Sequence, residues 1–94
     1  MDMKRKRKIP NCGKLSELRN NRFVVGAKQL KKAVKNGSVR CVFLAENADP
    51  AVTEPLEMLC ADNHIPITWV STMADLGRAC GIEVGAAAAA VIDP

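Results

Sequence analysis

Residues 23–37 read FVVGAKQLKKAVKNG and combine a short apolar run with a helix-like pattern between two glycines. The apolar β-formers of residues 23–25 predict a short strand. Gly26 then opens a helix that should run to Asn36, and Gly37 is expected to end it in the left-handed conformation that glycine adopts freely. Apolar residues recur along this helix at a spacing of three and four, which predicts one buried face. That buried face should consist of Ala27, Leu30, Ala33 and Val34.

A second helix is expected after the dipeptide Asp49-Pro50, which predicts a turn. The helix should extend from about Thr53 to Asn63, with Thr53 or Glu54 as its cap. Pro55 would then lie in the first turn, where a proline is tolerated. The inward-facing residues of this helix should be Leu56, Leu59 and Cys60.

Two further strands and a third helix follow the same alternation. Residues 41–45 form an unbroken apolar run, typical of a strand buried on both faces. Residues 66–70 predict the next strand. Thr72, with Asp75 three residues later, resembles a capping box for a helix through Cys80, and Gly81 should end that helix.

The last segment, residues 86–92, reads AAAAAVI and leaves two structures open. Alanine favours a helix by intrinsic propensity. The run is short, however, follows Gly85 and ends in β-branched residues, which favours a strand. The repeated strand–helix order predicts an α/β sheet with helices on both faces. A chain of 94 residues holds one such domain, expected at residues 14–94.

Charge is divided sharply along the chain. The first forty residues hold thirteen of the fourteen Lys and Arg residues and two of the ten Asp and Glu residues, a net +11. The remainder holds Arg78 as its one Lys or Arg and carries a net −7. A concentrated positive end is typical of proteins that bind a polyanion, most often nucleic acid. The acidic remainder indicates a single binding face.

Residues 1–13 contain five consecutive basic residues, Lys4 to Lys8, and are expected to form a disordered basic arm. Adjacent like charges repel one another, and this segment has little apolar surface to bury. Such a run can be interpreted as a nuclear address or as an RNA-binding arm. We interpret it as a source of additional phosphate contacts.

Several classes of protein are disfavoured by what the sequence lacks. It has no apolar run of about eighteen residues that could span a membrane. The cysteines lie far apart without a CxxC pair and His64 is the single histidine, so a metal site is not expected. We expect four reduced thiols in a cytoplasmic protein. Cys80 could act as a nucleophile, but the sequence has no paired carboxylates, P-loop or GxGxxG motif, so neither catalysis nor a cofactor is expected.

Four lysines share one face of the helix that begins at Gly26: Lys28, Lys31, Lys32 and Lys35. They fall within an arc of about 100°, and each like-charged i, i+4 pair destabilises a helix by about 0.2–0.5 kcal/mol. A solvated lysine face is the ordinary interpretation. A bound anion is favoured here because a helix N-terminus offers free N–H groups to phosphate. Gln29 adds an amide that can contact a base edge.

A second group of residues lies between Gly77 and Gly85. Gly77 within a helix costs roughly 1 kcal/mol relative to alanine, which indicates that something packs against it. Residues 82–84, Ile82-Glu83-Val84, should form a loop that displays two apolar side chains able to cover an unstacked base, with Glu83 accepting from base amino groups. The alternative is an ordinary helix-to-strand turn in which Ile82 or Val84 enters the core.

Together, the two segments resemble the kink-turn-binding ribosomal protein family, the L-seven-Ae group, and particularly its bacterial ribosomal-protein-like members. The resemblance covers roughly residues 22–92 and rests on three motifs in order. These motifs are VGAKQLKKA at residues 25–33, AENADP at residues 45–50, and LGRACGIEVGAAAAA at residues 76–90.

The resemblance implies a three-layer α/β/α sandwich around a four-stranded mixed sheet, with residues 86–92 as a strand. The family recognises RNA kink-turns, in which a short bulge joins two stems beside tandem sheared G·A pairs. The helix at Gly26 would enter the groove beside these pairs, Asp49 would lie beside the flipped-out nucleotide, and residues 82–84 would cap the bulge bases. The expected RNA-binding residues are Gly26, Lys28, Gln29, Lys31, Lys32, Asp49, Ile82, Glu83 and Val84.

The chain departs from the archaeal and eukaryotic members at a few positions. Their helix reads Gly-x-Asn-Glu, whereas Lys28 and Gln29 stand at the last two positions here, and Met73 replaces a lysine that many relatives carry. The bacterial members look similar at these positions. The sequence thus predicts a cytoplasmic, monomeric, ribosome-associated protein that stabilises kink-turns without catalysis. The alternative is a ribosomal structural or assembly protein that contacts ribosomal RNA without kink-turn selectivity.

Overall fold

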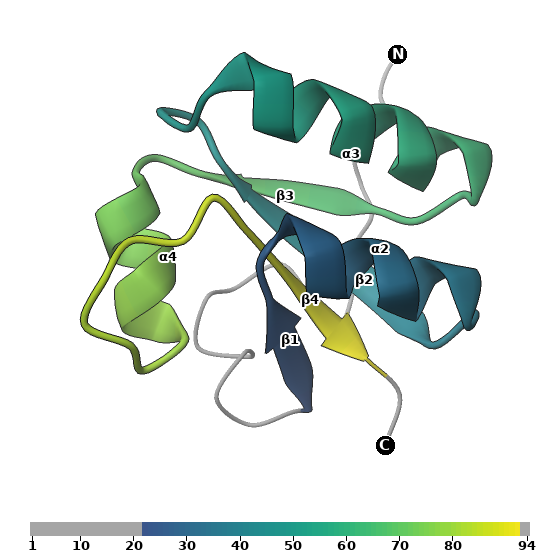
Figure 1. The fold of residues 1–94 in the computed structure, drawn as a ribbon, viewed down its shortest axis with the longest axis horizontal. Coiled ribbons are helices and arrows are strands. Elements are labelled where there is room, and N and C mark those ends of the chain that lie inside the picture. Colours follow the sequence, from purple (N-terminus) through teal and green to yellow (C-terminus); the bar gives the residue numbers. More distant parts are fainter. Residues whose placement is uncertain (1–21, 93–94) are drawn as a thin grey trace, which may run out of the picture.

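The computed structural model describes residues 22–92, which form three helices and four strands (Figure 1). In chain order the elements are β1 (Phe23–Val25), α2 (Ala27–Lys35), β2 (Val39–Ala45), α3 (Pro50–Asp62), β3 (Ile67–Val70), α4 (Met73–Ala79) and β4 (Ala88–Ile92). The predicted basic arm lies outside the described residues. Residues 14–20, where the spacing of Leu15 and Leu18 predicts a short helix, also lie outside them.

The four strands form one mixed sheet in the order β1-β4-β2-β3. Strand β4 runs antiparallel to both of its neighbours, and β2 runs parallel to β3. The four-stranded mixed sheet predicted from the family resemblance is therefore confirmed. Parallel β2 and β3 are joined by α3, the helical crossover that parallel neighbours require.

The alanine-rich segment is a strand, and its position explains why alanine does not make it a helix. Ala88, Ala89 and Ala90 are fully buried in β4, between β1 and β2. Alternate residues face opposite layers, because Ala89 joins one hydrophobic cluster and Ala88 joins the other. Small side chains let both layers pack closely on this strand, and tertiary packing outweighs helix propensity. The strand begins at Ala88; Ala86 lies in the preceding loop.

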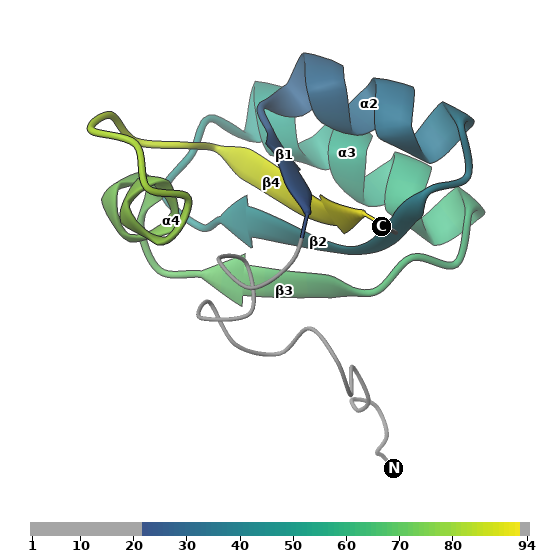
Figure 2. The same ribbon diagram turned by 90° about the horizontal axis from the view of Figure 1, so that it is seen from below.

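Helices cover both faces of the sheet, which confirms the three-layer α/β/α architecture. Helices α2 and α3 lie side by side on one face, where Leu30 and Leu56 pack against Leu44 (Figure 2). Helix α4 packs on the other face, where Leu76 belongs to the same cluster as Phe43. All five of these side chains are fully buried, so the core consists of two apolar layers separated by the sheet.

The start of α3 corrects the sequence prediction. The helix begins at Pro50, three residues before the expected Thr53, because the Asp49 carboxylate accepts a hydrogen bond from the Ala51 N–H at 2.9 Å. Asp49 is therefore the N-cap, and Pro50 takes the first helical position that suits proline. Pro55 lies inside the helix and not in its first turn, and it removes one backbone N–H donor there.

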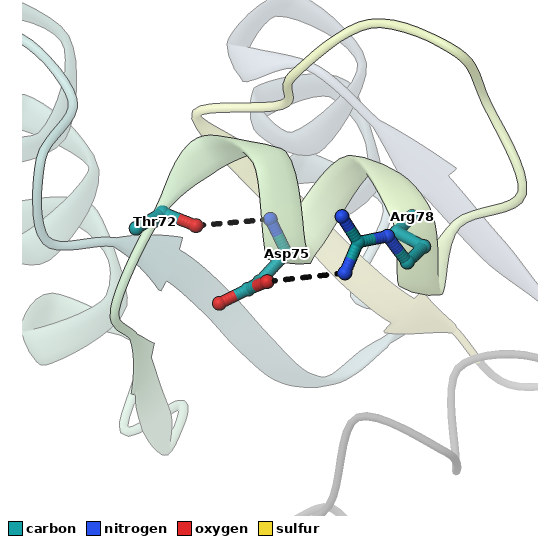
Figure 3. Close-up of polar contacts among 3 residues, drawn as sticks. All are labelled: Thr72, Asp75 and Arg78. Carbon is teal, nitrogen blue, oxygen red and sulfur yellow. Dashed lines mark hydrogen bonds and ion pairs between the residues drawn. The ribbon is translucent and has the colours of Figure 1, made fainter.

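The other predicted elements are confirmed with small changes at their ends. Strand β2 begins two residues before Cys41, and β3 begins one residue after Pro66. The Thr72 hydroxyl caps α4 by accepting from the Asp75 N–H at 3.0 Å (Figure 3). Helix α2 ends as expected, with Gly37 at a φ of 72°.

The cysteines differ from the prediction of four reduced thiols. Cys60 and Cys80 are free and buried, but Cys41 is disulfide-bonded, so the prediction is wrong for this residue. Cysteine spacing cannot determine pairing in a four-cysteine chain. Burial raises the pKa of the Cys60 thiol to about 11 and also raises that of Cys80, which keeps both thiols protonated near neutral pH.

Candidate nucleic-acid interface

The predicted site residues gather at one edge of the sheet. Strands β1, β2 and β3 end at this edge, and the antiparallel β4 begins there (Figure 1). The Gly26 N–H donates to the Ala88 carbonyl at 2.9 Å, and the Ala45 N–H donates to the Ala87 carbonyl at 3.0 Å. The start of α2, the turn after β2 and the loop before β4 are thereby joined by backbone hydrogen bonds.

Gly26 is required by its backbone conformation. Its φ of 98° and ψ of 150° lie in a region that side-chain-bearing residues rarely adopt. A Cβ built at Gly26 would meet no atom within 4 Å, so the glycine leaves an open space beside the helix start. Gly26 thus approaches the β4 backbone closely through its bond to Ala88 and leaves space where a side chain would begin.

The first turn of α2 exposes backbone donors and basic side chains together. Gly26 provides no side-chain cap, and no acidic residue lies in the first turn. Among the described residues, the N–H groups of residues 27–29 have no hydrogen-bond acceptor, as is usual for a helix N-terminus. Lys28, Gln29, Lys31 and Lys32 are exposed, and the buried residues occupy the opposite face. The predicted basic face therefore exists and is open to solvent.

The turn after β2 supplies two polar residues with structural roles. Asp49 is exposed and caps α3, so one carboxylate oxygen is engaged and the other is left open to a ligand. The Asn47 side-chain oxygen accepts from the Met73 N–H at 2.8 Å. The Met73 carbonyl in turn accepts from the Ala86 N–H at 3.0 Å. Asn47, which sequence reasoning did not assign, thus links the turn, α4 and the loop before β4.

The loop at residues 82–84 displays its side chains outward. Ile82 is 38% exposed and Val84 is 70% exposed, so the alternative that one of them enters the core is wrong. Glu83 is exposed between them. Two aliphatic side chains and one carboxylate therefore face solvent at the same edge of the sheet as Gly26.

Two glycines hold this loop against α4. The Val84 carbonyl occupies the place that a Cβ on Gly77 would take, and the prediction that a segment packs on Gly77 is confirmed. A Cβ on Gly85 would lie 3.0 Å from the Met73 Cβ. Both contacts are tighter than a larger residue allows, so the path of the loop across α4 is determined by close packing.

Within residues 22–92, no group of three or more His, Cys, Asp or Glu residues could hold a metal ion. No helix in this part of the chain is long and apolar enough to cross a membrane. The features that remain for binding are the basic first turn of α2, the polar turn around Asp49 and the displayed loop.

Known protein families and individual relatives match this chain over most of its length. Residues 13–94 match the profile of the ribosomal protein L7Ae/L30e/S12e/Gadd45 family. The chain is 45% identical over 70 residues to an RNA-binding protein of Bacillus pumilus, an alignment that covers 74% of this chain and 85% of the relative. It is 39% identical over 75 residues to the RNA-binding protein YbxF of Geobacillus stearothermophilus, covering 80% of this chain and 92% of the relative.

Solved structures show the same fold. The 15.5 kD RNA-binding protein of Giardia lamblia superposes with a TM-score of 0.74 at 27% identity, covering 85% of this chain and 66% of that one. A protein of unknown function from Bacillus halodurans superposes with a TM-score of 0.72 at 29% identity, covering 90% of this chain and 83% of that one.

Proposed function

Because the chain belongs to the ribosomal protein L7Ae/L30e/S12e/Gadd45 family, we propose that it is a non-catalytic RNA-binding protein that recognises and stabilises kink-turns. Relatives at 45% and 39% identity are RNA-binding proteins, which supports RNA as the partner. We further propose that it acts as a cytoplasmic, ribosome-associated monomer. Kink-turn selectivity, the ribosomal location and the monomeric state are our inferences.

One observation supports this proposal most strongly. The exposed lysines and free N–H groups of α2 and the displayed aliphatic loop lie at the same edge of the sheet, joined through the Gly26 to Ala88 hydrogen bond. The lysines and N–H groups of α2 can bind phosphates, and the aliphatic side chains of the loop can pack on unstacked bases. A kink-turn offers both, since crowded backbone phosphates lie close to its bulged nucleotides.

The division of work in the proposed site follows from side-chain chemistry. Lys28, Lys31 and Lys32 would neutralise phosphates without reading sequence. Gln29 both donates and accepts, so its amide can bond to the edge of a base in the G·A pairs. The open space at Gly26 lets the RNA approach the helix start closely.

The remaining residues would contact the bulge. Ile82 and Val84 would cover a base that has left the stack, and Glu83 would accept hydrogen bonds from base amino groups. Asp49 would lie beside the flipped-out nucleotide with the carboxylate oxygen that does not cap α3. Selection among bulge sequences would therefore depend on the loop more than on the lysine face.

The proposed mechanism is a population shift. A free kink-turn RNA exchanges between open and tightly bent forms, and phosphate repulsion disfavours the bent form. A protein that binds the bent form more tightly increases its population by the ratio of the two affinities. Positive charge at the bend contributes to that ratio, since it is worth more where phosphates are crowded.

The test compares two RNAs of equal length, a kink-turn and a straight duplex, in gel-shift titrations at one salt concentration. We expect the duplex to bind at least about tenfold more weakly, a difference of about 1.4 kcal/mol. Equal affinities would refute kink-turn recognition and support the alternative, a protein that contacts ribosomal RNA without kink-turn selectivity. Sedimentation with ribosomal particles through a sucrose gradient tests the ribosomal location separately.

A further inference from the structure

A shallow hollow of about 380 Å³ lies between α4 and the loop before β4. It is lined by Ala74, Arg78, Ile82, Glu83, Val84 and Gly85. Arg78 is the one positively charged residue of this set. The proposed RNA contacts above do not include it. It is also the one Lys or Arg beyond position 40 in the chain.

The Arg78 side chain is held loosely and remains available. It is 79% exposed, and its Nη1 lies 3.5 Å from an Asp75 carboxylate oxygen one turn earlier on α4 (Figure 3). A guanidinium carries five N–H donors in a planar fork, so one long ion pair leaves most of them free. Exposed i, i+3 pairs of this kind stabilise a fold very little, and a ligand can compete for the guanidinium at small cost.

Two backbone contacts fix the loop against α4 next to Arg78. Gly77, next to Arg78 in α4, carries the Val84 carbonyl directly against its backbone. The Ile82 N–H also donates to the Gly77 carbonyl at 3.1 Å. The aliphatic loop residues and the guanidinium are thus tied to the same turn of α4 and form one composite surface.

We propose that Arg78 binds a backbone phosphate of the nucleotide whose base covers Ile82 and Val84, and this inference rests on the proposed kink-turn function. The aliphatic side chains face the base, and Glu83 can accept from its amino groups, so the phosphate is the part of that nucleotide left for a cation. Arginine forms bidentate hydrogen bonds with phosphate, a geometry that lysine cannot reproduce. Arg78 would therefore add a positive charge beside the loop, apart from the lysines of α2.

The experiment measures the affinity of the full chain for a kink-turn RNA across a series of salt concentrations. Arg78→Ala should weaken binding about tenfold or more and reduce the slope of log affinity against log salt by about 0.7–0.9. Arg78→Lys should keep the slope while recovering only part of the affinity. Arg40→Ala is the matched control, because Arg40 carries the same charge near the opposite end of β2, and its slope should be unchanged.

Phosphate-ethylation interference identifies the contact directly. One ethylated phosphate at the bulge should block the wild-type protein and have no effect on Arg78→Ala. Loss of affinity with an unchanged slope, an unaltered interference pattern, or an equal effect of Arg40→Ala would each overturn the inference. If wild type binds a straight duplex as tightly as the kink-turn, the proposed function fails, whereas an inert Arg78→Ala in a kink-turn-selective protein refutes only the role of Arg78.

Discussion

Replacing Gly77 by alanine separates two physical arguments that predict opposite signs. Gly77 is buried in the middle of α4, where glycine weakens a helix. By helix propensity alone, Gly77→Ala would stabilise the protein by about 1 kcal/mol. The structure predicts the reverse, because the added Cβ would occupy the position of the Val84 carbonyl and come within 3.1 Å of the Gly85 Cα.

The magnitude follows from the nature of the obstacle. Overpacking costs typically about 1–3 kcal/mol, and the upper part of that range applies because a backbone carbonyl cannot move aside as a side-chain tip can. After the gain in helix propensity, the net loss should be about 1–2 kcal/mol. For a domain of this size, each kcal/mol corresponds to about 4–8 °C in Tm, so Tm should fall by roughly 5–15 °C.

Circular dichroism melting of the two proteins gives the Tm change, and gel shifts give the change in RNA affinity. Displacement of the loop should weaken kink-turn binding more than duplex binding, since the duplex offers no bulge to the loop. Gly85→Ala is a graded companion, because its Cβ would press on the Met73 side chain at 3.0 Å and should cost less. A rise in Tm for Gly77→Ala would refute the packing argument.

Three further predictions address individual residues of the proposed site. Lys32→Ala should weaken binding to all RNAs and reduce the salt slope by about 0.7–0.9; an unchanged slope would remove Lys32 from the phosphates. Glu83→Ala should change the preference among bulge sequences, measured with a panel of kink-turns, and a uniform loss would contradict a role in selection. Asp49→Ala should destabilise the fold by about 1 kcal/mol through loss of the α3 cap, whereas Asp49→Ser should preserve stability. Equal melting curves for the two Asp49 variants would exclude the capping contribution.

The alternation of strands and helices could be predicted because it depends on local patterns. Residues 41–45 of β2 are all apolar since they are buried, and α2 has one apolar and one basic face. The alanine-rich strand could not be resolved from local pattern alone. This segment forms a strand because it pairs with β1 and β2 on its two sides. Those pairings join residues far apart in the sequence. Family resemblance supplied what propensity could not.

Two predictions were wrong, the start of α3 and the state of Cys41, because the sequence allowed two outcomes at each. Thr53 and Asp49 are both good N-caps, and the helix begins at the earlier one because Pro50 fits the first helical position. The prediction for Cys41 was a reduced thiol, whereas this buried residue is disulfide-bonded, and neither spacing nor burial determines pairing. In both cases the residue types indicated a helix cap and a cysteine in the core. Which residue caps the helix, and whether the cysteine is paired, depend on the folded structure.

For the candidate site, the sequence predicted the residues that carry exposed charge or glycine and missed those that act through the backbone. Asn47 belongs to the quoted AENADP motif, yet its bond to the Met73 N–H joins residues 26 positions apart. No local pattern reveals such a contact. Arg78 was visible as an isolated cation, but its place beside the aliphatic loop depends on the packing of that loop over Gly77.

The position of the acidic residues constrains how an RNA can approach. Helix α3 lies beside α2 on the same face of the sheet and carries Glu54, Glu57 and Asp62 without any Lys or Arg. Packed helices lie about 8–10 Å apart, close to the Debye length of about 8 Å at physiological salt. Phosphates laid along both helices would therefore meet repulsion from α3 as well as attraction from α2. The sheet edge, where the first turn of α2 and the loop at residues 82–84 meet, also carries exposed carboxylates, on Glu46, Asp49 and Glu83. Charge thus disfavours an extended duplex laid across both helices, and any carboxylate contact at the edge must be offset by hydrogen bonds to base amino groups, the role proposed for Glu83.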